Sequence, residues 1–211
     1  MTTKPMGKLY IICEWIMKLA SVNLLWIMFT ASGLFLFGFM PATVALFTIV
    51  RKWFRKETEV PIWKTYLSVY KSEFTKSNTF GFIFIVAGLI LYVDYYLILH
   101  LDGFMRIVSI SILLLITCLY AITLLFFFPV YVHYQLRFID YFKYSFFLGI
   151  LNIHITLLIL LGLAADIFLL LYIPGLLPFF SGISAACILM SSSILLFQRL
   201  QKQNMNKAII E

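Results

Sequence analysis

The chain has 211 residues, of which 63% are hydrophobic and only 12% are charged. A soluble domain averages about 45–50% apolar and about 25% charged residues, so this composition excludes a soluble fold and indicates an integral membrane protein. The formal net charge of +7 does not indicate nucleic-acid binding, because the cations border apolar runs, where they orient membrane spans and attract anionic lipid.

The N-terminal helical unit, residues 9–56, is apolar almost without interruption as far as residue 50. As one straight helix, residues 9–50 would reach about 63 Å at 1.5 Å per residue, about twice the thickness of the hydrocarbon layer. We therefore predict that the unit is broken between Gly33 and Pro41 and folds back. The alternative is one kinked span over 22–50, with residues 9–20 lying in the membrane interface.

Three residues carry the fold-back prediction. A first helix over about 9–31 would turn at Gly33, and a second helix would open at Pro41, where the missing N–H of proline costs nothing. Gly33 and Gly38 would allow an irregular return, and Gly38 would also allow close helix contact. Glu14 and Lys18, four residues apart on the first helix, are expected to pair.

The segment 51–78 is basic and amphipathic. It begins with Arg51, Lys52 and Trp53, and Pro61 then opens a predicted surface helix. Its aromatic stripe recurs at helical spacing and consists of Trp63, Tyr66 and Tyr70, followed by Phe74. We predict that this cytoplasmic helix lies on the inner membrane surface or contacts another protein.

Four further spans are predicted at about 79–99, 107–133, 146–172 and 176–197, each long enough to cross the hydrocarbon layer. The expected fold is all-α, a polytopic membrane helix bundle with five to six crossings and a single membrane domain over 1–211. Lys and Arg number seven between 51 and 79, two between 134 and 145 and three after 197. This bias places the C-terminus in the cytoplasm and, with the fold-back, the N-terminus also.

Ionisable residues inside spans are candidates for function by default. Asp94 and Asp166 lie toward the predicted outer ends of their spans, and His154 lies in an inner half. Together they could form a proton or cation path. In the alternative interpretation Asp94 pairs with Arg106 across a short loop, and Asp166 lies beside headgroup water.

Motifs for catalysis, cofactors or metals are absent from the sequence. It has no HExxH, P-loop, GxGxxG or GxSxG pattern, and its histidines and cysteines lack ligand spacing. We therefore predict no catalytic residue, no cofactor and no metal site.

Residues 23–74 resemble the signature of the YesL family, small bacterial membrane proteins whose defining domain has no assigned function. The matching elements are Asn23-Leu24-Leu25-Trp26, Gly38, Pro41-Ala42-Thr43, Ala45-Leu46, Arg51-Lys52-Trp53, Pro61 and Lys71-x-Glu73-Phe74. The resemblance implies a bacterial cell-membrane protein. It also implies a link to sugar uptake, because members of the family are often encoded beside sugar-binding ABC transport systems and polysaccharide-degrading enzymes in Gram-positive bacteria.

We expect a non-enzymatic protein that assists or regulates a carbohydrate uptake system. Its expected partners are the lipid bilayer and an ABC-type sugar transport system. Segment 51–78 is the expected contact surface. The alternative is a small transporter or permease in its own right. An ABC permease subunit is disfavoured, because the 134–145 loop lacks the EAA-type pattern of a coupling loop.

Overall fold

The computed structural model describes the backbone of residues 5–210 and the side chains of residues 9–199. Lys4, one of the N-terminal cations, lies outside the described residues. Every regular element in the described range is helical: α1 (Pro5–Ser32), α2 (Leu36–Phe54), α3 (Ile62–Ile98), α4 (Gly103–His133), α5 (Phe138–Leu151), α6 (Ile153–Tyr172), the 3-10 turn η1 (Pro174–Leu176) and α7 (Leu177–Ile210). Six helices, all but α5, are long and apolar enough to cross a membrane. The predicted all-α polytopic bundle is confirmed.

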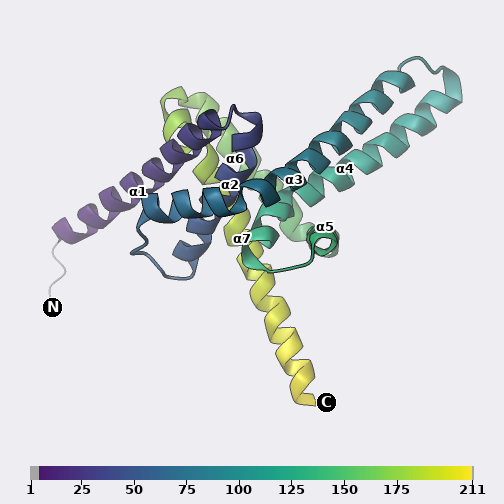
Figure 1. Cartoon of the computed structure of the whole chain (residues 1–211). Coiled ribbons are helices and arrows are strands. Elements are labelled where there is room, and N and C mark those ends of the chain that lie inside the picture. The colour runs from purple at the N-terminus through teal and green to yellow at the C-terminus, as the bar shows by residue number, and fades with distance from the viewer. Residues whose placement is uncertain (1–4, 211) are drawn as a thin grey trace.

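Helices α1 and α2 form a tight hairpin, so the unit folds back and does not make one kinked span (Figure 1). The Phe35 N–H donates to the Thr30 carbonyl at 3.0 Å, and the Gly38 N–H donates to the Gly33 carbonyl at 3.0 Å. A Cβ on Gly38 would lie 2.6 Å from the Phe29 carbonyl oxygen. Only glycine therefore lets α2 return so close to the end of α1.

The prediction that the second helix opens at Pro41 is wrong, because α2 already begins at Leu36. The return takes only three residues, with Leu34 and Phe35 in the left-handed region at φ 55° and 60°. Such a conformation costs an ordinary residue roughly 1–2 kcal/mol. Pro41 therefore lies inside a helix, where it offers no N–H to the Phe37 carbonyl. The Asn78 amide of α3 donates to that carbonyl instead, at 2.9 Å.

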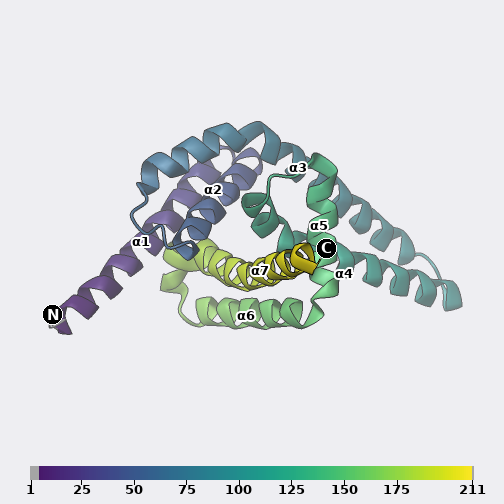
Figure 2. The same ribbon diagram turned by 90° about the horizontal axis from the view of Figure 1, so that it is seen from below.

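Helix α3 joins two elements that the sequence suggested were separate. The predicted surface helix after Pro61 and the predicted span 79–99 form one continuous helix of 37 residues. It arches over α1 and α2 (Figure 2). Its aromatic stripe faces the hairpin: the Phe29 ring lies 5.3 Å from the Tyr66 ring and 4.8 Å from the Tyr70 ring, between centroids. Tyr66 is fully buried, whereas Trp63 stays 56% exposed.

The second half of α3 and the first half of α4 form a helical arm that projects from the body of the molecule (Figures 1 and 2). An aromatic cluster holds the base of the arm. Phe80 of α3 is fully buried, with its ring 5.2 Å from the Phe127 ring of α4 and 4.2 Å from the Phe138 ring of α5. Beyond this base the arm exposes apolar side chains from both helices.

The remaining predicted spans differ in their bounds. The span 146–172 is divided at Asn152, whose backbone (φ −121°, ψ 50°) leaves the helical region, into the end of α5 and the whole of α6. Most of the 134–145 loop is therefore the start of α5. Helix α7 runs beside α6 and continues beyond the predicted end at 197 (Figure 2).

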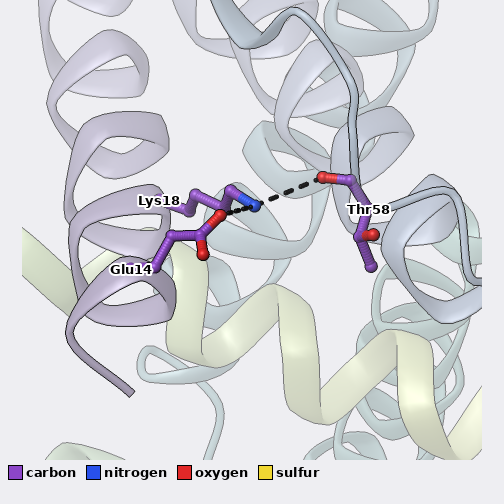
Figure 3. Close-up of polar contacts among 3 residues, drawn as sticks. All are labelled: Glu14, Lys18 and Thr58. Carbon is purple, nitrogen blue, oxygen red and sulfur yellow. Dashed lines mark hydrogen bonds and ion pairs between the residues drawn. The ribbon is translucent and has the colours of Figure 1, made fainter. Parts of the chain in front are cut away.

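The Glu14–Lys18 pair predicted on α1 is confirmed, with a distance of 2.6 Å between Nζ and Oε1. Lys18 Nζ also lies 3.4 Å from the Thr58 carbonyl oxygen, and so contacts the loop between α2 and α3 (Figure 3). Partly exposed pairs of this kind contribute little to stability. The pair does identify which face of α1 lies against this loop.

We expect Gly38→Ala to destabilise the hairpin, because the new methyl group would meet backbone atoms that cannot move aside. Overpacking of this kind typically costs about 1–3 kcal/mol. The thermal unfolding midpoint in detergent should fall by several degrees. Gly7→Ala is the matched control, since a Cβ there meets nothing within 4 Å. Equal midpoints for the two variants would contradict close contact at Gly38.

Candidate functional site

A fully buried asparagine joins α1 to α7. The Asn23 amide Nδ2 donates to the Pro178 carbonyl at 2.9 Å, and its Oδ1 accepts the N–H groups of Gly182 at 2.8 Å and Ile183 at 3.0 Å. Gly182 permits this approach, because a Cβ there would lie 3.0 Å from the Trp26 ring. One side chain thus serves three backbone groups of another membrane helix.

Other side chains of residues 23–74 form hydrogen bonds that hold the hairpin of α1 and α2 together. The Trp26 indole N–H donates to the Thr43 hydroxyl at 3.1 Å and so ties α1 to α2. From α3, the Tyr66 hydroxyl donates to the Ala42 carbonyl at 2.7 Å and the Tyr70 hydroxyl donates to the Phe29 carbonyl at 3.2 Å. Buried hydrogen bonds of this kind fix the relative positions of the three helices.

The polar cavity lies where α2, α3 and α4 meet the link into α5. It has a volume of about 690 Å³, and its lining includes two arginines, one lysine, one glutamate and one histidine: Arg51, Arg55, Lys76, Glu73 and His133. Arg51 belongs to the predicted basic end of α2, and Glu73 belongs to the Lys71-x-Glu73-Phe74 element of the family signature. The fold therefore brings two parts of the signature to one cavity.

The charges in the polar cavity are only partly compensated. The Tyr131 hydroxyl donates to Glu73 Oε2 at 2.6 Å. Arg51 Nη1 donates to the Val132 carbonyl, while its Nε is buried with no hydrogen-bond partner among the described residues. Lys76 Nζ lies 5.1 Å from the Tyr131 ring centroid and 5.2 Å from that of Tyr141. In the described part of the chain neither Arg51 nor Lys76 lies within 4.0 Å of a carboxylate.

The two other residues of the Arg51-Lys52-Trp53 element do not line the polar cavity. Lys52 lines a separate hollow with Lys56 and the loop that follows it. Trp53 is buried and packs edge-on against Trp15, with 5.4 Å between ring centroids. The cations at the end of α2 thus divide between two hollows.

The three ionisable residues proposed to form a membrane path do not come together. Asp94 is exposed on the arm and lines a small hollow between α3 and α4. Asp166 of α6 accepts a hydrogen bond from the Ser184 hydroxyl of α7 at 2.9 Å. His154 is exposed in the first turn of α6. No hydrogen bond or ion pair links the three among the described side chains.

The expected pairing of Asp94 with Arg106 is not formed either. Both side chains lie in the described range, and the ion pair identified there joins Glu14 to Lys18 instead. The part of the chain that the structure describes also contains no group of three His, Cys, Asp or Glu residues placed to hold a metal.

Comparison with known proteins places the signature, residues 23–74, inside a family match. The family model described as "Protein of unknown function, DUF624" matches residues 19–95. "Uncharacterized protein YesL" of Bacillus subtilis (strain 168) is 33% identical over 197 residues, covering 93% of both chains. The chain belongs to the YesL family.

Two further relatives from the same organism extend the likeness over most of the chain. "Uncharacterized protein YesV" is 35% identical over 204 residues, covering 97% of this chain and 98% of the relative. "Uncharacterized protein YteU" is 40% identical over 176 residues, covering 83% of this chain and 79% of the relative. No solved structure matches the chain.

We expect Asn23→Ala to destabilise the protein strongly, because each buried backbone group left without a partner costs about 1–3 kcal/mol. Asn152→Ala is the matched control: Asn152 is half-buried, and its amide donates only to the Leu148 carbonyl one turn earlier. Thermal unfolding in the same detergent should show a much lower midpoint for the Asn23 variant. Similar midpoints for both variants would show that Asn23 does not hold α1 against α7.

Proposed function

We propose that this protein is a non-enzymatic accessory or regulatory partner of a carbohydrate uptake system in the bacterial cell membrane, with both termini in the cytoplasm. The observation that carries the proposal is the arm of α3 and α4. Tyr92, Phe104 and Leu114 of the arm are between 64% and 77% exposed. An arm that leaves the body with apolar sides uncovered offers two membrane helices to the helices of another protein.

The choice of partner comes from the family. The resemblance to YesL proteins implies genes beside sugar-binding ABC transport systems, and the membrane subunits of such a system supply helices of the required kind. The arm is a better contact surface than segment 51–78, which the sequence suggested, because Tyr66 and Tyr70 of that segment already pack against the hairpin.

The transporter alternative has weaker support. A path across the membrane needs several polar groups that converge, whereas no hydrogen bond or ion pair joins Asp94, Asp166 and His154 in the described part of the chain. The polar cavity contains cations, but it opens at the end of the bundle that the charge bias assigns to the cytoplasm.

Alanine substitutions on the exposed apolar surface of the arm should weaken binding of the proposed transporter subunits. We expect a variant with Tyr92, Phe104 and Leu114 changed to Ala to lose co-isolation of sugar ABC transport membrane subunits from native membranes. The matched control changes Leu161, Phe168 and Tyr172 of α6, which are between 73% and 78% exposed, to Ala and should retain them. Loss from both variants, or from neither, would contradict the arm as the contact surface.

Purified protein in liposomes should move neither sugar nor ions by itself. Circular dichroism of the same liposomes must show the helical content of the detergent-purified protein. Flux that is abolished by Asp94→Asn together with Asp166→Asn would overturn the accessory role and establish a transporter.

A further inference from the structure

We propose that the polar cavity binds a phosphate group, carried either by a membrane lipid headgroup or by a soluble phosphorylated molecule. This inference does not depend on the proposed accessory function. It rests on the charge balance, the unused hydrogen-bond donors and the size of the cavity.

The charge balance calls for an anion. Arg51, Arg55 and Lys76 contribute three positive charges, and Glu73 contributes the one negative charge. Two positive charges therefore remain in the lining of the cavity and attract an anion, although Glu57 outside the lining also acts on Arg51. A phosphate monoester carries a charge of about −1.5 to −2 at neutral pH and so balances this excess, whereas the phosphodiester of a lipid headgroup carries a single negative charge and balances part of it.

The donors of the cavity suit phosphate oxygens. Arg51 uses one N–H on the Val132 carbonyl, and its Nε is buried without a partner among the described residues. His133 also has a buried Nδ1 without a partner in the described range. These two buried nitrogens are not accessible from the cavity, so the donors open to a phosphate are those of Arg55 and Lys76, which are exposed. A guanidinium group binds phosphate through paired hydrogen bonds.

Among the described side chains, Glu73 does not form an ion pair with a cation of the cavity within 4.0 Å, and its carboxylate accepts a hydrogen bond from Tyr131 instead. The Tyr131 hydroxyl donates to its carboxylate at 2.6 Å, and the rings of Tyr131 and Tyr141 lie beside the Lys76 ammonium. These contacts position the lysine within the cavity wall. The volume of about 690 Å³ lies in the range of small-molecule sites and holds a phosphate with a substantial organic group.

The test compares two double variants with equal loss of charge. Arg55→Gln with Lys76→Gln removes two cavity cations, both exposed, so the fold should survive. Lys52→Gln with Lys56→Gln removes two cations that line the neighbouring hollow. The first probe is inorganic phosphate, titrated at constant ionic strength against chloride while thermal unfolding in detergent is followed.

We expect phosphate to raise the unfolding midpoint of the wild-type protein. The cavity double variant should bind phosphate at least about tenfold more weakly, and the control double variant less than about twofold more weakly. Should the cavity variant not fold, Arg55→Gln and Lys76→Gln are measured singly, each with a smaller loss.

The second probe distinguishes the two sources of phosphate. Native mass spectrometry measures retention of phosphatidylglycerol against phosphatidylcholine after purification in each lipid. Selective retention of phosphatidylglycerol that the cavity double variant loses identifies a lipid headgroup. Stabilisation by inorganic phosphate without such retention identifies a soluble phosphorylated ligand. Failure of both probes, or equal losses in the two double variants, overturns the proposal.

Discussion

The close contact of two backbones at the turn between α1 and α2 is the constraint on which the rest of the structure depends. Gly38 lies against the carbonyl groups that end α1, so no side chain can separate the two helices there. This contact sets the direction of α2, and α2 in turn carries the carbonyls of Phe37 and Ala42 to the side chains of α3 that bind them. The path of α3 across the hairpin follows from these bonds.

The polar residues of the hairpin act chiefly on backbone groups of neighbouring helices. Within the hydrocarbon layer, a backbone carbonyl that lacks its helical N–H donor cannot accept a hydrogen bond from water instead. Asn78 meets this need for the carbonyl freed by Pro41. Pro41 and Asn78, separated by 37 positions in the chain, therefore depend on each other: Pro41 frees the Phe37 carbonyl, and Asn78 supplies its hydrogen bond.

Much of the fold could be predicted from the sequence. Its composition and apolar runs indicated the class and five to six spans, and the excessive length of residues 9–50 favoured a fold-back over one kinked span. The exact turn could not be predicted, because Leu34 and Phe35 accept positive φ values that their side chains disfavour. The break at Asn152 was missed because the apolar pattern continues on both sides of it, and Gly149, three residues earlier, lies inside α5 and not at the break.

The candidate site was predictable only in part. Arg51 was singled out for its place at the end of an apolar run, but its neighbours in the cavity come from distant segments. Lys76 and Tyr131 gave no local signal, because an exposed lysine and a tyrosine near a span end are ordinary in membrane proteins. Asn23 did stand out as a polar residue inside an apolar run, and attention to that single feature could have identified it.

Because α3 is one helix from Ile62 to Ile98, it connects the wall of the polar cavity mechanically to the arm. The stretch from residue 76 to residue 98 is about 33 Å long at 1.5 Å per residue. A tilt of about 5° at Lys76 would therefore move the far end of α3 by roughly 3 Å if the helix stays rigid. Helix α3 therefore joins the charged lining of the polar cavity to the exposed apolar surface of the arm in one continuous element.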